Sequence, residues 1–200
     1  MTSQTQYWNR LIQPGIVALV GAGGKTTVLS KLVEYGRLQG RPIVVTTTTH
    51  LYESQVAQYE PIYTKNINDV DEYCTKRIQQ GYCGAWFNGI TRTKVDAVDC
   101  ESIDGLSALH PNWQIVVEAD GAKEKWLKAP KHTEPVIPSQ TKTTIGVVNL
   151  QMLGTSLDED HVHNLELVQS IVHREEGAIV TPHMLAQIVL HKQGLFQYSK

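Results

Sequence analysis

The stretch VALVGAGGKTTVLSKL, residues 17–32, runs from a β-branched apolar segment through a glycine-rich turn into an amphipathic segment. The apolar run over 15–20 is typical of a strand that is covered on both faces of a sheet. Over 26–38, apolar residues recur on one helical face, and a glycine and a proline follow the last of them. The stretch therefore predicts a strand and a helix joined by a glycine turn, with Lys25 at the hinge.

The rest of the chain repeats the same two kinds of pattern. Strands over 15–20 and 42–49 should be parallel members of one βαβ unit. Strands that alternate with helices predict an α/β fold with a mainly parallel sheet flanked by helices, in three layers, α/β/α. We expect residues 1–200 to form a single domain. Further strands are expected near 84–90, at 113–122 and at 143–150, and further helices at 69–80, near 164–174 and at 182–192.

Composition and charge exclude several classes of protein. The chain is 41% hydrophobic and 19% charged, with a formal net charge of −2. A protein built to bind nucleic acid usually carries a basic excess, so no nucleic-acid partner is expected. No apolar run reaches the length of a membrane span, and the N-terminus lacks the pattern of a signal peptide. Three cysteines fit neither a closed disulfide set nor a common zinc motif, which favours a cytoplasmic location.

The glycine turn has the residues of a phosphate-binding loop in an unusual spacing. The common pattern G-x-x-x-x-G-K-[ST] has a glycine where this chain has Leu19. A glycine loop between a buried strand and a helix lets backbone N–H groups face an anion. We expect Lys25 to reach phosphate oxygens and a hydroxyl of Thr26 or Thr27 to bind Mg²⁺ beside ATP or GTP. The alternative is a plain turn with an exposed lysine. The expected nucleotide-binding residues are Gly21, Ala22, Gly23, Gly24, Lys25, Thr26 and Thr27.

A second candidate feature is the acidic end of the strand over 113–122. Glu118 and Asp120 stand where a Mg²⁺-nucleotide site places a carboxylate. We expect the strand to end or bulge between them, so that both carboxylates face one ion. We expect Lys25, Glu118 and Asp120 to be catalytic, and Thr26, Glu118 and Asp120 to surround Mg²⁺. The alternative is that the carboxylates only cap a turn.

Two loops at the same edge supply further candidates. The run TTTTHL, 46–51, ends the second parallel strand, and its last residues would serve as a switch or contact a substrate, or belong only to the strand. The loop over 121–138 carries four lysines, and it is either a solvated loop or a cover for phosphates or an anionic substrate. His161 and His163 are two apart, a spacing that can chelate a metal at a strand edge, but a lone H-x-H pair is a weak signal and we do not expect a metal site there. The candidate switch or substrate residues are Thr48, Thr49, His50, Lys123, Lys128 and His132.

Two motifs resemble those of nucleotide-dependent enzymes. The form G-x-x-G-K-T-T resembles the short loop of the Mur ligases and folylpolyglutamate synthetases, which also lack the earlier glycine and bind ATP. The spacing from Glu118 to Gly121, ExxG, resembles the third motif of metallochaperone-type GTPases. In those enzymes the acidic residue senses the γ-phosphate and holds Mg²⁺ through water.

The segments VGAGGKTT, VVTTTTH, EADGAK, LKAP, HTEPVIP, GVVNLQMLG and VTPHMLAQIVLHKQG, in this order, resemble the YqeC-like proteins. That family is described as accessory factors of selenium-dependent molybdenum hydroxylases. The resemblance implies a P-loop NTPase-like fold, a molybdenum or selenium cofactor species or a client hydroxylase as partner, and a site that includes Arg174. Family members look longer at the C-terminus, where a motif like N-[KQ]-x-D would read guanine, so we expect this chain to lack that segment.

Three functions stay open at this point. The first is an accessory protein that binds and hydrolyses ATP or GTP. The second is an ATP-dependent small-molecule kinase or ligase-like enzyme, and the third is a protein that uses the nucleotide as a structural ligand. Lys25→Ala should abolish the binding of Mg²⁺-ATP or Mg²⁺-GTP and leave the thermal unfolding midpoint of the unliganded protein nearly unchanged.

Overall fold

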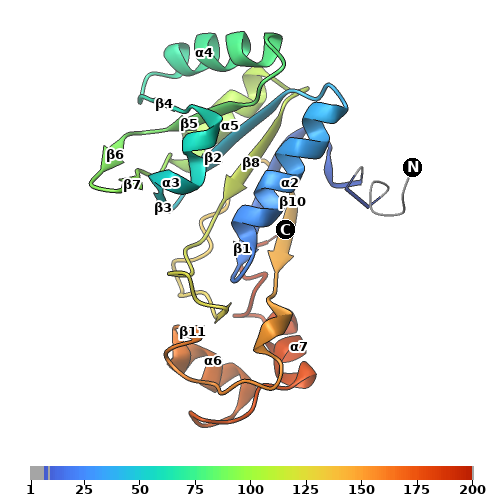
Figure 1. Cartoon of the computed structure of the whole chain (residues 1–200), viewed down its shortest axis with the longest axis vertical. Coiled ribbons are helices and arrows are strands. Elements are labelled where there is room, and N and C mark those ends of the chain that lie inside the picture. The colour runs from blue at the N-terminus through green and yellow to red at the C-terminus, as the bar shows by residue number, and fades with distance from the viewer. Residues whose placement is uncertain (1–6, 9, 200) are drawn as a thin grey trace.

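The computed structural model describes residues 7–8 and 10–199, and its centre is a six-stranded sheet in which every neighbouring pair is parallel. The strand order is β10-β1-β8-β2-β5-β4. Figure 1 shows the strands running toward the same end of the molecule. The α/β class with a mainly parallel sheet is therefore confirmed. The strands are β1 Gly15–Gly21, β2 Ile43–Thr47, β4 Ile62–Tyr63, β5 Gly84–Phe87, β8 Gln114–Glu118 and β10 Thr141–Val147.

The sequence pattern predicts that β1 and β2 belong to one βαβ unit. In the structure, strand β8 lies between them. Leu19 of β1 and Thr47 of β2 are both in register with Glu118, the last residue of β8. All residues of β1, β2 and β8 are buried, as expected for strands covered on both faces. The order of the strands brings the glycine turn, the threonine run and Glu118 to one edge.

Helices cover both faces of the sheet, which confirms the three-layer arrangement. Leu29 and Leu32 of helix α2, Lys25–Leu38, pack against one face of the sheet, in the same apolar cluster as Leu19 of β1. Helices α4, Ile67–Gln79, and α5, Cys100–Leu109, cover the opposite face around Ile115 (Figure 1). Each face thus buries alternate residues of the strands.

Polar caps fix where three of the helices begin. The side chains of Asn66, Asp99 and Thr181 accept backbone N–H groups at the starts of α4, α5 and α7. Helix α7, Pro182–Leu190, has its proline in the first turn, as predicted. Helix α5 was not predicted, because glycine and polar residues in its sequence, CESIDGLSAL, leave only a weak periodic pattern of apolar residues.

The C-terminal part forms a second apolar cluster beyond the carboxyl ends of the strands (Figure 1). It joins α6, Leu165–Val172, and α7 to residues Leu127 and Ala129 of the long loop. Leu195 then packs back against Ala18 and Val20 of β1. This part therefore packs against the sheet near the carboxyl ends of the strands.

Short elements complete the chain, and the sequence patterns did not predict them. Strands β3 Leu51–Tyr52, β7 Lys94–Val95 and β6 Ile90–Thr91 form a small antiparallel sheet, and β9 Leu127–Lys128 pairs with β11 Val162–His163. The remaining helical turns are α3 Glu53–Val56, η1 Ala57–Tyr59 and η2 Leu150–Met152. None of the helices in the described part is long and apolar enough to cross a membrane.

Candidate functional site

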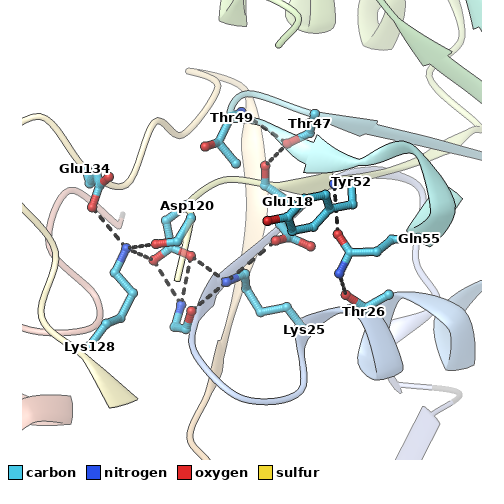
Figure 2. A network of polar contacts seen from close by, with 12 residues as sticks. Lys25, Thr26, Thr47, Thr49, Tyr52, Gln55, Glu118, Asp120, Lys128 and Glu134 are labelled. Carbon is cyan, nitrogen blue, oxygen red and sulfur yellow. Dashed lines mark hydrogen bonds and ion pairs between the residues drawn. The ribbon is translucent and has the colours of Figure 1, made fainter. Parts of the chain in front are cut away.

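The carboxyl edge of the sheet opens into a cavity of about 700 Å³. Its walls come from the start of α2, the segment after β2, the loop after β8 and single residues of other elements. Figure 2 shows the polar side chains on its floor. The residues that line it are 23–27, 49–52, Gln55, Lys94, Glu118, 121–126, Lys131, Glu134, Asn149 and His163.

The glycine turn needs its glycines. Gly21, Gly23 and Gly24 have φ values of 103°, 66° and 149°, all in the region that side chains disfavour. A Cβ on Gly23 would lie 2.5 Å from the Cβ of Asn149. Gly24 is the N-cap of α2 and offers no side chain to the first helical N–H groups. The turn therefore brings bare backbone to the cavity wall.

Lys25, the first residue of α2, points down to the cavity floor and is only 5% exposed. Its Nζ donates to the carbonyl oxygen of Gly21 at 2.6 Å and lies 3.2 Å from Asp120 Oδ1. Glu118 Oε1 is 3.6 Å from the same nitrogen. The amine is thus held by oxygens of three residues, two of them buried carboxylates (Figure 2).

Asp120 lies under the cavity floor and is not among the residues that line it. Its carboxylate accepts the Gly21 N–H at 3.0 Å and pairs with Lys128 Nζ at 3.2 Å. Lys128 also donates to the Gly121 carbonyl oxygen at 2.6 Å and to Glu134 Oε2 at 3.0 Å. Strand β8 ends at Glu118, which lets both Glu118 and Asp120 approach Lys25.

Of Glu118 and Asp120, Glu118 is the carboxylate that lines the cavity. Its Oε2 is buried and has no hydrogen-bond partner among the described residues. Burial raises the pKa of Glu118 to about 6, and the positive charge of Lys25 limits the rise. A buried, unpartnered carboxylate oxygen is costly unless a ligand or cation meets it. Glu118 therefore presents an unpartnered carboxylate oxygen that a ligand or cation in the cavity would satisfy.

The pKa of Glu118 gives a test of this geometry. Because the folded-state pKa lies above the ordinary value of 4.5, the folded chain holds the proton more tightly than the unfolded chain, and this residue's contribution to stability falls as pH rises from about 4.5 to 6. Glu118→Gln should therefore raise the free energy of unfolding at pH 7.5 by up to about 2 kcal/mol and lose this advantage near pH 4. Urea unfolding at both pH values measures the effect.

The matched control for that experiment is Glu72→Gln, at an exposed position of α4. It should change the free energy of unfolding little at either pH. A Glu118→Gln variant less stable than the wild type at pH 7.5 would contradict the assignment, since it would mean that the ionised carboxylate stabilises the fold.

The threonine run divides into scaffold and cavity residues. The hydroxyl of Thr47 donates to the Glu118 carbonyl oxygen at 2.8 Å, and that of Thr48 donates to the Val136 carbonyl oxygen at 2.6 Å. Both threonines therefore hold the edge together. Thr49 and His50 line the cavity.

The other candidate residues fall in different places. Lys123 lines the cavity, whereas Lys128 lies beneath it. His132 and Arg174 are outside the lining. The His132 carbonyl oxygen accepts the hydroxyl of Tyr198, and Arg174 donates to the carbonyl oxygen of its neighbour His173. Gly21 and Ala22 also lie outside this lining. Among the described residues, no three His, Cys, Asp or Glu side chains gather as a metal site.

Several cavity residues were missed by sequence reasoning. Gln55 donates to the Thr26 hydroxyl at 3.4 Å and accepts the N–H of Tyr52. Tyr52, Trp126 and Asn149 also line the cavity. Tyr52 and Gln55 lie on the short elements β3 and α3, whereas Trp126 and Asn149 lie in loops, and no periodic pattern predicts any of these positions. The segment between Tyr52 and Gln55 directly follows the threonine run, which is the one signal that pointed toward it.

Comparison with known proteins gives the family. The model of the YqeC protein family matches residues 17–166, three quarters of the chain. The chain belongs to the YqeC family. It is 29% identical over 186 residues to the uncharacterized protein YqeC of Escherichia coli strain K12, a match that covers 92% of this chain and 71% of that relative. No solved structure gave a significant match. The YqeC family match includes the glycine turn, Glu118 and the lysine-bearing loop.

Proposed function

We propose that this YqeC-family chain binds a Mg²⁺-nucleoside triphosphate, ATP or GTP, with its phosphates against the glycine turn. The observation that carries the proposal is the buried, unpartnered Oε2 of Glu118 at a cavity wall made of bare glycine backbone and the start of a helix. Backbone amides and a helix N-terminus favour an anion, and an unpartnered carboxylate favours a cation. Both together suit a phosphate chain with its metal.

Lys25 supports the proposal through its position. Its amine lies at the floor, between the glycine turn and the two carboxylates. A lysine that gives up its contact with the Gly21 carbonyl oxygen would offer its charge to β- and γ-phosphate oxygens while staying near Glu118. Stabilising negative charge on a transferring phosphoryl group is the main contribution a protein makes to such chemistry.

Mg²⁺ fits the residues present. Mg²⁺ usually takes one or two protein carboxylates or hydroxyls and completes its shell with phosphates and water. Glu118 and the hydroxyl of Thr26, both lining the cavity, would hold it. Asp120 would keep its present role of fixing Gly21 and Lys25. When bound, the ion would supply charge neutralisation of the phosphates.

Turnover measurements with and without an acceptor would distinguish the classes of reaction. Phosphate release without an acceptor would support a nucleotide-hydrolysing accessory protein, in keeping with the resemblance to factors that mature selenium-dependent molybdenum hydroxylases. Turnover only with an acceptor would support the small-molecule kinase or ligase-like alternative. Tight binding without turnover would leave the nucleotide as a structural ligand.

Glu118→Gln tests the metal assignment separately. The neutral amide should raise the Mg²⁺ concentration needed for half-maximal nucleotide binding at least about tenfold, because the carboxylate charge is lost. Calorimetric titration of ATP at fixed Mg²⁺ concentrations measures it. The control is Glu124→Gln, which lines the same cavity from the exposed loop. Equal Mg²⁺ dependence in both variants would count against Glu118 as a ligand.

A further inference from the structure

The ion pairs under the cavity form a chain with two ends. Asp120 lies in the middle, with Lys25 and Glu118 on one side and Lys128 and Glu134 on the other (Figure 2). Both end carboxylates line the cavity, whereas Asp120 does not. The Glu118 end lies beside the glycine turn, and the Glu134 end belongs to the long loop after β8. The cavity floor therefore offers two chemically different positions.

The Glu134 end carries a surplus of positive charge. The carboxylate of Glu134 is already paired with Lys128 at 3.0 Å. Lys123 and Lys131 line the cavity with exposed side chains, and neither forms an ion pair with an acidic side chain among the described residues. Lys125 is held by the Asp160 carbonyl oxygen at 3.0 Å. The two lysines at 123 and 131 thus remain to meet an anion.

His163 adds a polar group to the same wall. It lines the cavity from β11, directly beside Lys128 of β9 in the strand register. Burial, and then the charges of Lys128, Lys123 and Lys131, lower the pKa of His163, while Glu134 opposes them. The imidazole is therefore neutral at pH 7 and offers one N–H donor in a positive field.

The loop that presents this wall holds a strained backbone. Lys123 and Glu124 have φ values of 48° and 62°, two successive residues with side chains in the left-handed region. Such conformations cluster at ligand sites, where the surrounding structure enforces them. The strain lies at the residues that bring Lys123 to the cavity.

We propose that the Glu134 end of the cavity binds a second small-molecule ligand through a phosphate monoester dianion, held by Lys123, Lys131 and His163. That this ligand is a second one, beside a nucleotide, rests on the proposed binding of the nucleotide at the Glu118 end. Two lysines match the charge of a phosphate monoester, which is close to −2 at neutral pH. Lysine amines bind phosphate as point charges, and no described residue of the lining is an arginine, whose planar fork suits a carboxylate or a phosphate.

The experiment follows the ring protons of His163 by NMR, with the signal assigned by its loss in His163→Gln. Glycerol phosphate and inorganic phosphate are titrated into the full chain, alone and with a saturating non-hydrolysable Mg²⁺-ATP analogue. We expect both probes to shift the His163 signal with dissociation constants below about 1 mM and to raise its pKa. Lys123→Ala/Lys131→Ala should weaken binding at least about tenfold, and malonate should bind about tenfold more weakly than glycerol phosphate.

A charge-matched double variant, Lys65→Ala/Lys76→Ala, changes exposed lysines at and before α4 and should bind as the wild type does. Glycerol phosphate that binds equally well to Lys123→Ala/Lys131→Ala would overturn the proposal, as would no shift of the His163 signal. Displacement of glycerol phosphate by the analogue would also overturn it, since the wall would then serve the nucleotide's own phosphates. If the analogue fails to bind and glycerol phosphate still does, the anion site stands and the proposed function fails.

Discussion

Lys25→Ala should lower the affinity for Mg²⁺-ATP or Mg²⁺-GTP by at least about 100-fold, because it removes the one lysine whose amine lies between the glycine turn and Glu118. Isothermal titration of the purified variant measures this. The same change should lower the free energy of unfolding of the unliganded protein by about 3 kcal/mol, since it strips a partner from two buried carboxylates. A domain of this size retains enough stability to stay folded.

The matched control is Lys31→Ala on the outer face of the same helix. Lys31 forms an exposed pair with Glu34, so both nucleotide affinity and stability should stay close to those of the wild type. A folded Lys25→Ala variant that binds nucleotide as the wild type does would contradict the proposed site. An unchanged free energy of unfolding would contradict the buried ion pairs and leave the nucleotide site untouched.

Lys128→Met should lower the free energy of unfolding by about 3–5 kcal/mol. The side chain of Lys128 is 1% exposed, and its amine meets Asp120, Glu134 and the Gly121 carbonyl oxygen. Methionine keeps the apolar stem and removes every one of these contacts. Urea unfolding at pH 7.5 measures the loss.

The control for that loss is Lys131→Met, at an exposed position three residues along the same loop, which should change stability by less than about 0.5 kcal/mol. The pH dependence adds a second readout. Burial alone would raise the pKa of Glu134, but Lys128, together with the backbone N–H of Lys131 and with His163, lowers it below its ordinary value. Stability from this pair is present above the ordinary carboxyl pKa and is lost as pH falls through the lowered one. Equal losses in the two lysine variants would show that Lys128 has no special role.

Local sequence patterns predicted most of the central fold. The apolar runs that became β1, β2, β8 and β10 are long enough to read from one sequence, as are the faces of α2 and α7. The position of β8 between β1 and β2 was not predicted, because β8 is contributed from about seventy residues beyond β2 and no local pattern encodes long-range pairing. The unexpected α5 shows the same limit for a helix with a weak periodic pattern.

The sequence predicted the residue types of the candidate site but not the contacts that these residues make with one another. Lys123, Lys128 and Lys131 look alike in the sequence, yet only Lys128 lies on a paired strand, β9, and is buried with two carboxylates. The expectation that Lys25→Ala would spare the unliganded protein treated Lys25 as a ligand-binding residue alone. The ion pairs to Glu118 and Asp120 give the opposite expectation. Such connections depend on segments that meet only after folding.

The wild-type titration that serves as the reference for Lys25→Ala tests the central claim most directly. ATP and GTP are titrated into the full chain by calorimetry, with Mg²⁺ and again with a chelator in its place. We expect saturable binding of one nucleotide per chain with a dissociation constant in the micromolar range, weakened when Mg²⁺ is removed. Absence of saturable binding of either nucleotide at millimolar concentration, by a chain that unfolds cooperatively, would contradict the account.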